Sequence, residues 1–127
     1  MELVVAILIV GILATLALPR FNKTLETGRA QEARAALRQI RTAERVYRLK
    51  QGFYYPHFSA HPNAEDDVGT IFADLKVQLG SKSWNYSIDT TNVDQFTAEA
   101  ERIGGVNVGE KITIDQAGTM DESNWTP

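Results

Sequence analysis

The chain has 127 residues, a formal charge of −3 and no cysteine. A chain of this length holds one small domain, and the absence of cysteine excludes disulfide bonds and thiol chemistry. The sequence contains no glycine-rich phosphate loop and no His-Glu-x-x-His motif. We therefore expect no enzymatic activity, no cofactor and no metal site.

The first predicted element is an apolar segment at residues 1–19, called the stem below. The run from Leu3 to Leu18 is too apolar on every side to be one face of a soluble amphipathic helix. Its 16 residues, at about 1.5 Å each, fall somewhat short of the ~20 that span a bilayer. Glu2 stands at its start, where a carboxylate is costly in lipid unless it meets water or a cation.

Three interpretations of the stem are possible: a secretory signal peptide, a membrane anchor, and a helix that leaves the membrane to pack inside an assembly. A signal peptide fits least well, because only Met1 and Glu2 precede the apolar run. A signal peptide begins with basic residues, and Ala14-Thr15-Leu16-Ala17 is only a partial cleavage site. The other two interpretations remain open on these residues alone.

Three motifs in the stem resemble the N-terminal helix of type IV pilins and pseudopilins: Glu2-Leu3-Val4-Val5, Gly11-Ile12-Leu13-Ala14 and Leu18-Pro19. The resemblance implies a structural subunit of an extracellular filament on the cell surface, made as an inner-membrane precursor and assembled by pilus or secretion machinery. It also implies that a leader peptide and about three mature residues precede Met1 in the full protein. The expected partner is a second copy of the chain, and the filament is a helical homo-oligomer.

The resemblance gives roles to individual stem residues. Glu2 would pair with the N-terminal amine of a neighbouring subunit and set the axial register. Gly11 and Pro19 would mark a segment, near Thr15, that loses helical hydrogen bonds in the filament; a simple proline kink is the equally weighted alternative. The apolar side chains would pack in the filament core, and they are Leu3, Val4, Val5, Ile7, Leu8, Val10, Ile12, Leu13 and Leu16.

Two alternatives to a pilin remain at this point. One is a pseudopilin of type II secretion, and the other, from a different class, is a monomeric binding domain with a membrane anchor. Adhesion, motility, DNA uptake and conduction are all left open.

Residues 20–51 predict a second, amphipathic stretch of the same helix. Gly52 is expected to cap it in the left-handed conformation. Val46 and Leu49 are expected to join the core, and arginines to fill the opposite, solvated side. The apolar stripe recurs at spacings of three and four and comprises Ala33, Ala36, Leu37, Ile40, Ala43 and Tyr47.

Charge divides the chain after Lys50. The segment from Arg20 to Lys50 holds nine cations and three acids, whereas the rest of the chain after it holds four cations and twelve acids. Nucleic acid is a possible partner for such a basic helix but is not favoured, because charge runs are usually solvated faces that complement acidic neighbours.

Residues 52–127 predict a globular head that begins with an irregular loop. The aromatics Phe53, Tyr54, Tyr55 and Phe58 are expected to pack the helix against the head. His57 and His61, near Glu65, Asp66 and Asp67, are a disfavoured metal site, because Pro56 and Pro62 exclude a helix there. Thr70 is expected to cap a short helix that runs to Lys76.

Three alternating segments predict strands at Trp84–Ile88, Phe96–Ala100 and Lys111–Asp115, with a possible short edge strand between Thr119 and Trp125. Trp84, Ile88, Phe96, Ile112 and Ile114 would face the helix as core. The predicted fold is α+β, a long helix packed on an antiparallel sheet of three to four strands. Calcium ligands are a possible role for Asp66, Asp67, Asp89, Asp94 and Asp115, but solvated acids in turns are favoured.

Overall fold

A computed structural model describes residues 1–56, 68–80 and 82–127 of the chain. One long helix, α1 (Glu2–Gln51), is followed by a short helix, α2 (Val68–Leu75), and then by four strands. The strands are β1 (Trp84–Asn92), β2 (Gln95–Arg102), β3 (Lys111–Asp115) and β4 (Met120–Asp121). They form an antiparallel meander in the order β1-β2-β3-β4. The predicted α+β fold is confirmed, including the short fourth strand.

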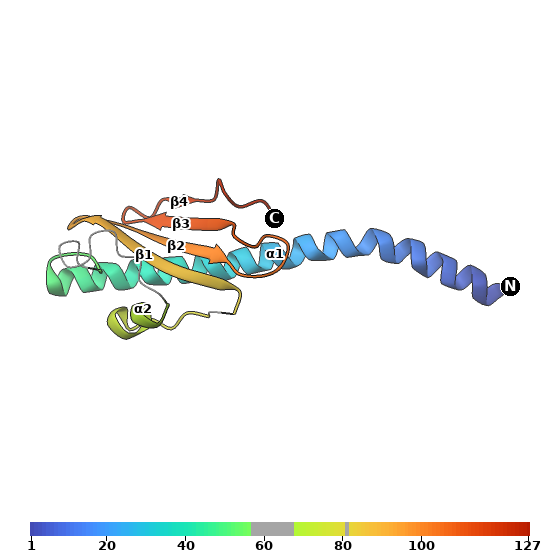
Figure 1. Ribbon diagram of the computed structural model, residues 1–127, viewed down its shortest axis with the longest axis horizontal. Helices are drawn as coiled ribbons and strands as arrows, with labels where there is room; N and C mark the ends of the chain where they lie inside the picture. The colour runs from blue at the N-terminus through green and yellow to red at the C-terminus, as the bar shows by residue number, and fades with distance from the viewer. Residues whose placement is uncertain (57–67, 81) are drawn as a thin grey trace.

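The sheet lies along the C-terminal half of α1, and the N-terminal half of the helix projects beyond it (Figure 1). Burial alternates along β1, β2 and β3, so every second side chain faces the helix. Ala98 lies between Ile88 and Ile114 across the sheet, and Ala100 lies between Tyr86 and Ile112. Small residues on the central strand and on the helix stripe leave room for the two layers to approach closely.

The core follows the predicted pattern in most places. The strand residues Trp84, Ile88, Phe96, Ile112 and Ile114 are all buried, as predicted. Ala33, Ala36, Leu37 and Ile40 of the helix stripe are buried too, and Ala43 and Tyr47 are partly buried against them.

Two predicted details at the C-terminal end of α1 are confirmed. Gly52 caps α1 at φ 87°, and its N–H donates to the Arg48 carbonyl over 2.7 Å. Tyr54 and Tyr55 are buried, and the Tyr54 ring lies 4.8 Å from that of Phe96. These aromatics therefore pack the end of the helix against the sheet, as expected.

Two sequence predictions were wrong. Val46 and Leu49 are 47% and 88% exposed, because the helix turns them away from the buried stripe. Position 70 is not the N-terminal boundary of α2, since that helix already begins at Val68. The basic face of α1 does meet acidic neighbours, as expected: Arg34 pairs with Glu122, and Arg48 pairs with Asp94.

Most of the candidate metal ligands lie outside the described residues, namely His57, His61, Glu65, Asp66 and Asp67. The same holds for the aromatic residue Phe58. Of the other acids considered for calcium, Asp94 pairs with Arg48, and Asp115 accepts hydrogen bonds from the backbone of Gly118 and Thr119. Within residues 1–56, 68–80 and 82–127, no group of three His, Cys, Asp or Glu side chains is placed to hold a metal ion.

Candidate functional site

The stem is a helix without a folded partner. The projecting half of α1 is exposed from Glu2 to Leu25, and Glu26 is the first buried residue (Figure 1). In the described part of the chain, α1 is the one helix that contains a segment long and apolar enough to cross a membrane. The large stem side chains are 51–73% exposed, and they are Leu3, Val4, Val5, Ile7, Leu8, Ile9, Val10, Ile12, Leu13, Leu16 and Leu18.

All nine predicted packing residues belong to this exposed set. Removing apolar surface from water contributes about 25 cal/mol of favourable free energy per Å². A helix with large apolar side chains on every side therefore gains strongly from burying them. Within the described residues, the head leaves this apolar surface uncovered, and the stem residues contribute nothing to the core of the head.

Glu2 lies in the first turn of α1 and is exposed. Within the described residues, the Glu2 side chain accepts no hydrogen bond and makes no ion pair. Its carboxylate is therefore open to a cation from outside the chain.

The predicted weak segment is helical in the isolated chain. Pro19 lies inside the unbroken helix, and Gly11 has open space where a Cβ would be. Pro19 has no N–H, so the Thr15 carbonyl lacks its usual helical donor. The Thr15 hydroxyl donates to the Ile12 carbonyl over 2.7 Å instead, so it does not compensate for the carbonyl that Pro19 leaves free.

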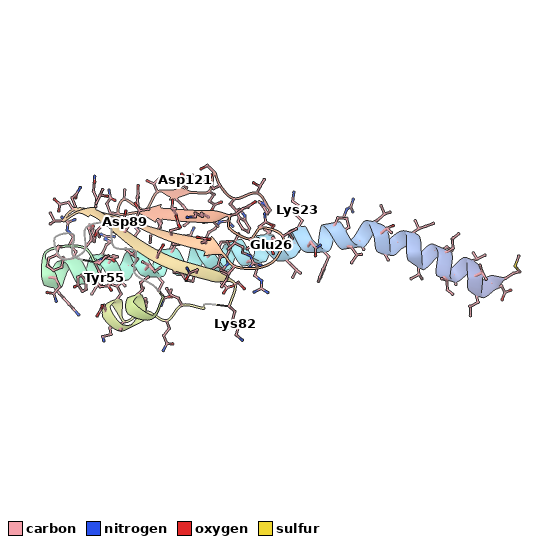
Figure 2. The ribbon with its side chains drawn as sticks, in the orientation of Figure 1. Lys23, Glu26, Tyr55, Lys82, Asp89 and Asp121 are labelled. Atoms are coloured by element: carbon pink, nitrogen blue, oxygen red, sulfur yellow. The ribbon has the colours of Figure 1, made fainter. Side chains whose placement is uncertain are left out.

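A buried ion pair holds α1 against the head at the point where the helix begins to project. Glu26 and Arg102 form a two-pronged contact, with Nε–Oε2 and Nη2–Oε1 distances of 2.9 Å, and both side chains are at least nine-tenths buried. Arg102 Nη1 also donates to the carbonyls of Ser83 and Ile103 over 2.7 Å. Hydrogen bonds from Arg102 hold the pKa of Glu26 below its usual range. Figure 2 shows Glu26 at the point where the helix leaves the sheet.

The same junction holds a second set of contacts. Trp84 Nε1 donates to the Arg29 carbonyl over 2.9 Å, and the Arg29 guanidinium donates to the Ser83 hydroxyl. A Cβ on Gly105, at φ +80°, would lie 2.8 Å from both Arg102 Nη2 and Glu26 Oε1. Only glycine lets the loop after β2 cover the ion pair so closely. These contacts therefore hold residues 26–29 of α1 against the head.

A second buried glutamate lies near the other end of the head. Glu44 is fully buried, and its Oε2 accepts the backbone N–H of Tyr55 over 2.9 Å, while Oε1 has no hydrogen-bond partner among the described residues. Burial raises the pKa of Glu44 to about 8. The side chain is thus largely protonated at neutral pH and holds the start of the loop after α1 against the helix.

Glu26, Glu44 and Arg102 are functional residues that the sequence did not predict. Both glutamates belong to the three acids of the basic segment, and no motif gives Arg102 a role. A signal was present, because Glu26, Ala30, Ala33, Leu37, Ile40 and Glu44 follow one another at spacings of three and four, so the glutamates lie on the buried stripe.

No family model matches the chain, and no curated protein and no solved structure is significantly similar to it.

Proposed function

We propose that this chain is the structural subunit of a type IV pilus-like filament, in which stems from many copies pack side by side in the filament core and the heads lie outside. The observation that supports this is the exposed stem, whose apolar residues face outward on every side of the helix. The proposed role is not enzymatic.

Burial keeps the stem out of water both before and after assembly. Each Leu, Ile or Val side chain that moves from water to a fully buried position contributes roughly 1.5–3 kcal/mol. Before assembly, lipid of the inner membrane covers the exposed side chains of the stem, and in the filament neighbouring stems cover them. Because lipid is as apolar as the stems, close packing between helices and the pairing of Glu2, rather than transfer from water, favour the filament over the membrane.

Register requires more than apolar contact, because apolar helices slide past one another at little cost. A carboxylate among apolar stems is stable only when a cation pairs with it. Glu2 is exposed and makes no ion pair within the described residues, so it favours the one arrangement that brings the N-terminal amine of a neighbouring copy to it.

Electron microscopy of material sheared from the cell surface tests the proposal. An antibody to the head should label thin filaments, and a Glu2→Ala variant should reduce the amount of filament strongly. Glu32→Ala is the matched control, because Glu32 is an exposed acid of the same helix outside the stem.

The alternatives give different results in the same experiment. If the labelled protein stays in the membrane fraction as a monomer, the chain is an anchored binding domain and the proposal is wrong. A type II secretion pseudopilin is distinguished by a gene that lies beside secretion components rather than pilus components. Normal filaments from Glu2→Ala would exclude the register role of Glu2.

A further inference from the structure

A basic cavity opens near the C-terminal end of α1, far from the stem. It has a volume of about 550 Å³. Three arginines on one face of the helix, Arg41, Arg45 and Arg48, line it together with Leu49, Gly52, Tyr54 and Gln116. The proposed filament function does not use these residues.

Two of the three arginines are held in place by the head. Arg41 donates from Nη2 to the Ala117 carbonyl over 2.8 Å and from Nε to the Gln116 carbonyl over 3.3 Å. Arg48 pairs with Asp94, donates to the Tyr54 hydroxyl over 3.2 Å and lies 4.8 Å from the centre of the Tyr54 ring.

The glycine of the turn after β3 keeps this arrangement open. Gly118 has φ +95°, and a Cβ on it would lie 2.7 Å from Arg41 Cζ. A side chain at this position would displace the Arg41 guanidinium. Glycine leaves space for Arg41 to lie across the turn. The cavity wall is therefore built before any ligand arrives.

The charges in the cavity are not balanced. The Asp94 carboxylate compensates Arg48, whereas in the described part of the chain Arg41 has only neutral carbonyl partners. Within the described residues, Arg45 makes no hydrogen bond and no ion pair. Two guanidinium charges, one fixed and one free to move, thus face the same space without an anion.

We propose that this cavity binds a phosphate dianion, either free or carried as a monoester on a larger molecule. Guanidinium groups bind phosphate oxygens in pairs through parallel N–H donors, and two of them match the double charge of the dianion. A carboxylate or a phosphodiester carries one charge and leaves one guanidinium uncompensated. The volume accommodates a phosphate group together with its first atoms of attachment.

Titration calorimetry on the full chain in a nonionic detergent tests the proposal, with inorganic phosphate added at constant ionic strength and at about pH 7.5, where the dianion dominates. Arg45→Gln should weaken binding about tenfold, since one charge-assisted contact contributes on the order of 1.4 kcal/mol. Arg38→Gln is the matched control, because Arg38 is an exposed arginine of the same helix outside the cavity, and it should change the affinity less than twofold.

Methyl phosphate and dimethyl phosphate distinguish the sources of the ligand. Equal binding of methyl phosphate supports a monoester on a larger molecule, whereas binding of inorganic phosphate alone supports the free ion. Dimethyl phosphate should bind about tenfold more weakly, because it carries one charge. Three results overturn the proposal: no phosphate binding below about 10 mM, equal losses in Arg45→Gln and Arg38→Gln, or equal affinity for the diester. None of these results bears on filament formation.

Discussion

Glu44→Gln should make the head more stable at alkaline pH and leave it nearly unchanged at acid pH. The amide keeps the size of the carboxyl group, and its oxygen can accept the Tyr55 N–H that Glu44 Oε2 accepts now. Unlike the carboxyl group, the amide cannot ionise in its fully buried position. The substitution therefore isolates the cost of a buried charge from the contribution of the hydrogen bond.

The sign follows from the two pKa values of Glu44. In the unfolded chain the carboxyl group loses its proton near pH 4.5, and in the folded chain near pH 8. Between these values the folded state binds more protons than the unfolded state, so the contribution of Glu44 to stability falls as the pH rises and is constant above about 8. At about 1.4 kcal/mol per pKa unit, the full difference is on the order of 3–5 kcal/mol.

Urea unfolding of the full chain in a nonionic detergent measures this effect. Tryptophan fluorescence reports on the head alone, because Trp84 and Trp125 are its buried tryptophans and their rings lie 5.2 Å apart. The stabilities of wild type and Glu44→Gln should agree within about 1 kcal/mol at pH 4.5 and differ by about 3–5 kcal/mol at pH 9.

Glu32→Gln is the control for this experiment, since Glu32 is an exposed glutamate of the same helix, and it should follow the wild type across the pH range. A difference between wild type and Glu44→Gln that does not change with pH would refute the reasoning, because it would mean that Glu44 ionises in the folded state as easily as in the unfolded one.

Two further predictions use the same unfolding assay. Glu26→Gln should destabilise the head by about 3–5 kcal/mol at neutral pH, because it leaves Arg102 buried without a counter-charge. Because the pKa of Glu26 is lowered in the folded state, its carboxylate stabilises the fold at higher pH, and this stabilisation is lost as the carboxylate is protonated. The difference in stability between Glu26→Gln and the wild type should therefore shrink below about pH 4.5. A difference that stays constant with pH would contradict the ion-pair account. Gly118→Ala should cost about 1–2 kcal/mol through its positive φ and its contact with Arg41, whereas Gly28→Ala, inside the helix with open space around it, should add about 0.5–1 kcal/mol. If both substitutions raised the free energy of unfolding, or both lowered it, the positive φ of Gly118 would not explain its effect.

The strands and the helix could be predicted because each depends on a local pattern of burial. Alternation placed Trp84, Ile88 and Phe96 in the core, and a glycine after basic residues placed the end of the helix at Gln51. Val46 and Leu49 were assigned to the core from their apolar character alone. Each residue turns the helix by about 100°, so side chains next to the stripe point to solvent however apolar they are.

The buried glutamates could not be predicted with their partners. Glu26 and Arg102 are 76 residues apart in the sequence, and only the position of β2 beside the helix brings them together. Spacing along the helix does place Glu26 and Glu44 on the buried stripe, but an acid in a basic segment suggests a surface contact first. Local composition therefore suggests that Glu26 pairs with a cation on the surface, whereas in the fold it pairs with Arg102 in the interior.

The stem could be predicted as a helix. Whether its helix would stay intact in the proposed filament depends on contacts with other copies, which the isolated chain does not contain. The helix is unbroken from Glu2 to Gln51, although Pro19 leaves the Thr15 carbonyl without a donor. Helical proline costs about 3 kcal/mol relative to alanine. This cost makes the segment before Pro19 the easiest part of the stem to unfold when a lattice of subunits requires a longer stem.

Pro19→Ala tests whether filaments use this weakness. In detergent-solubilised monomers, it should slow amide hydrogen exchange between Ile12 and Leu18 by about 100-fold, because it restores a donor and removes a steric clash. Leu18→Ala, next to it, keeps both features and should change exchange little. If the segment unfolds on assembly, wild-type filaments should show a broken helix there, and Pro19→Ala filaments should either keep the helix continuous or form poorly. An unbroken helix in wild-type filaments would leave Pro19 with no role beyond a kink.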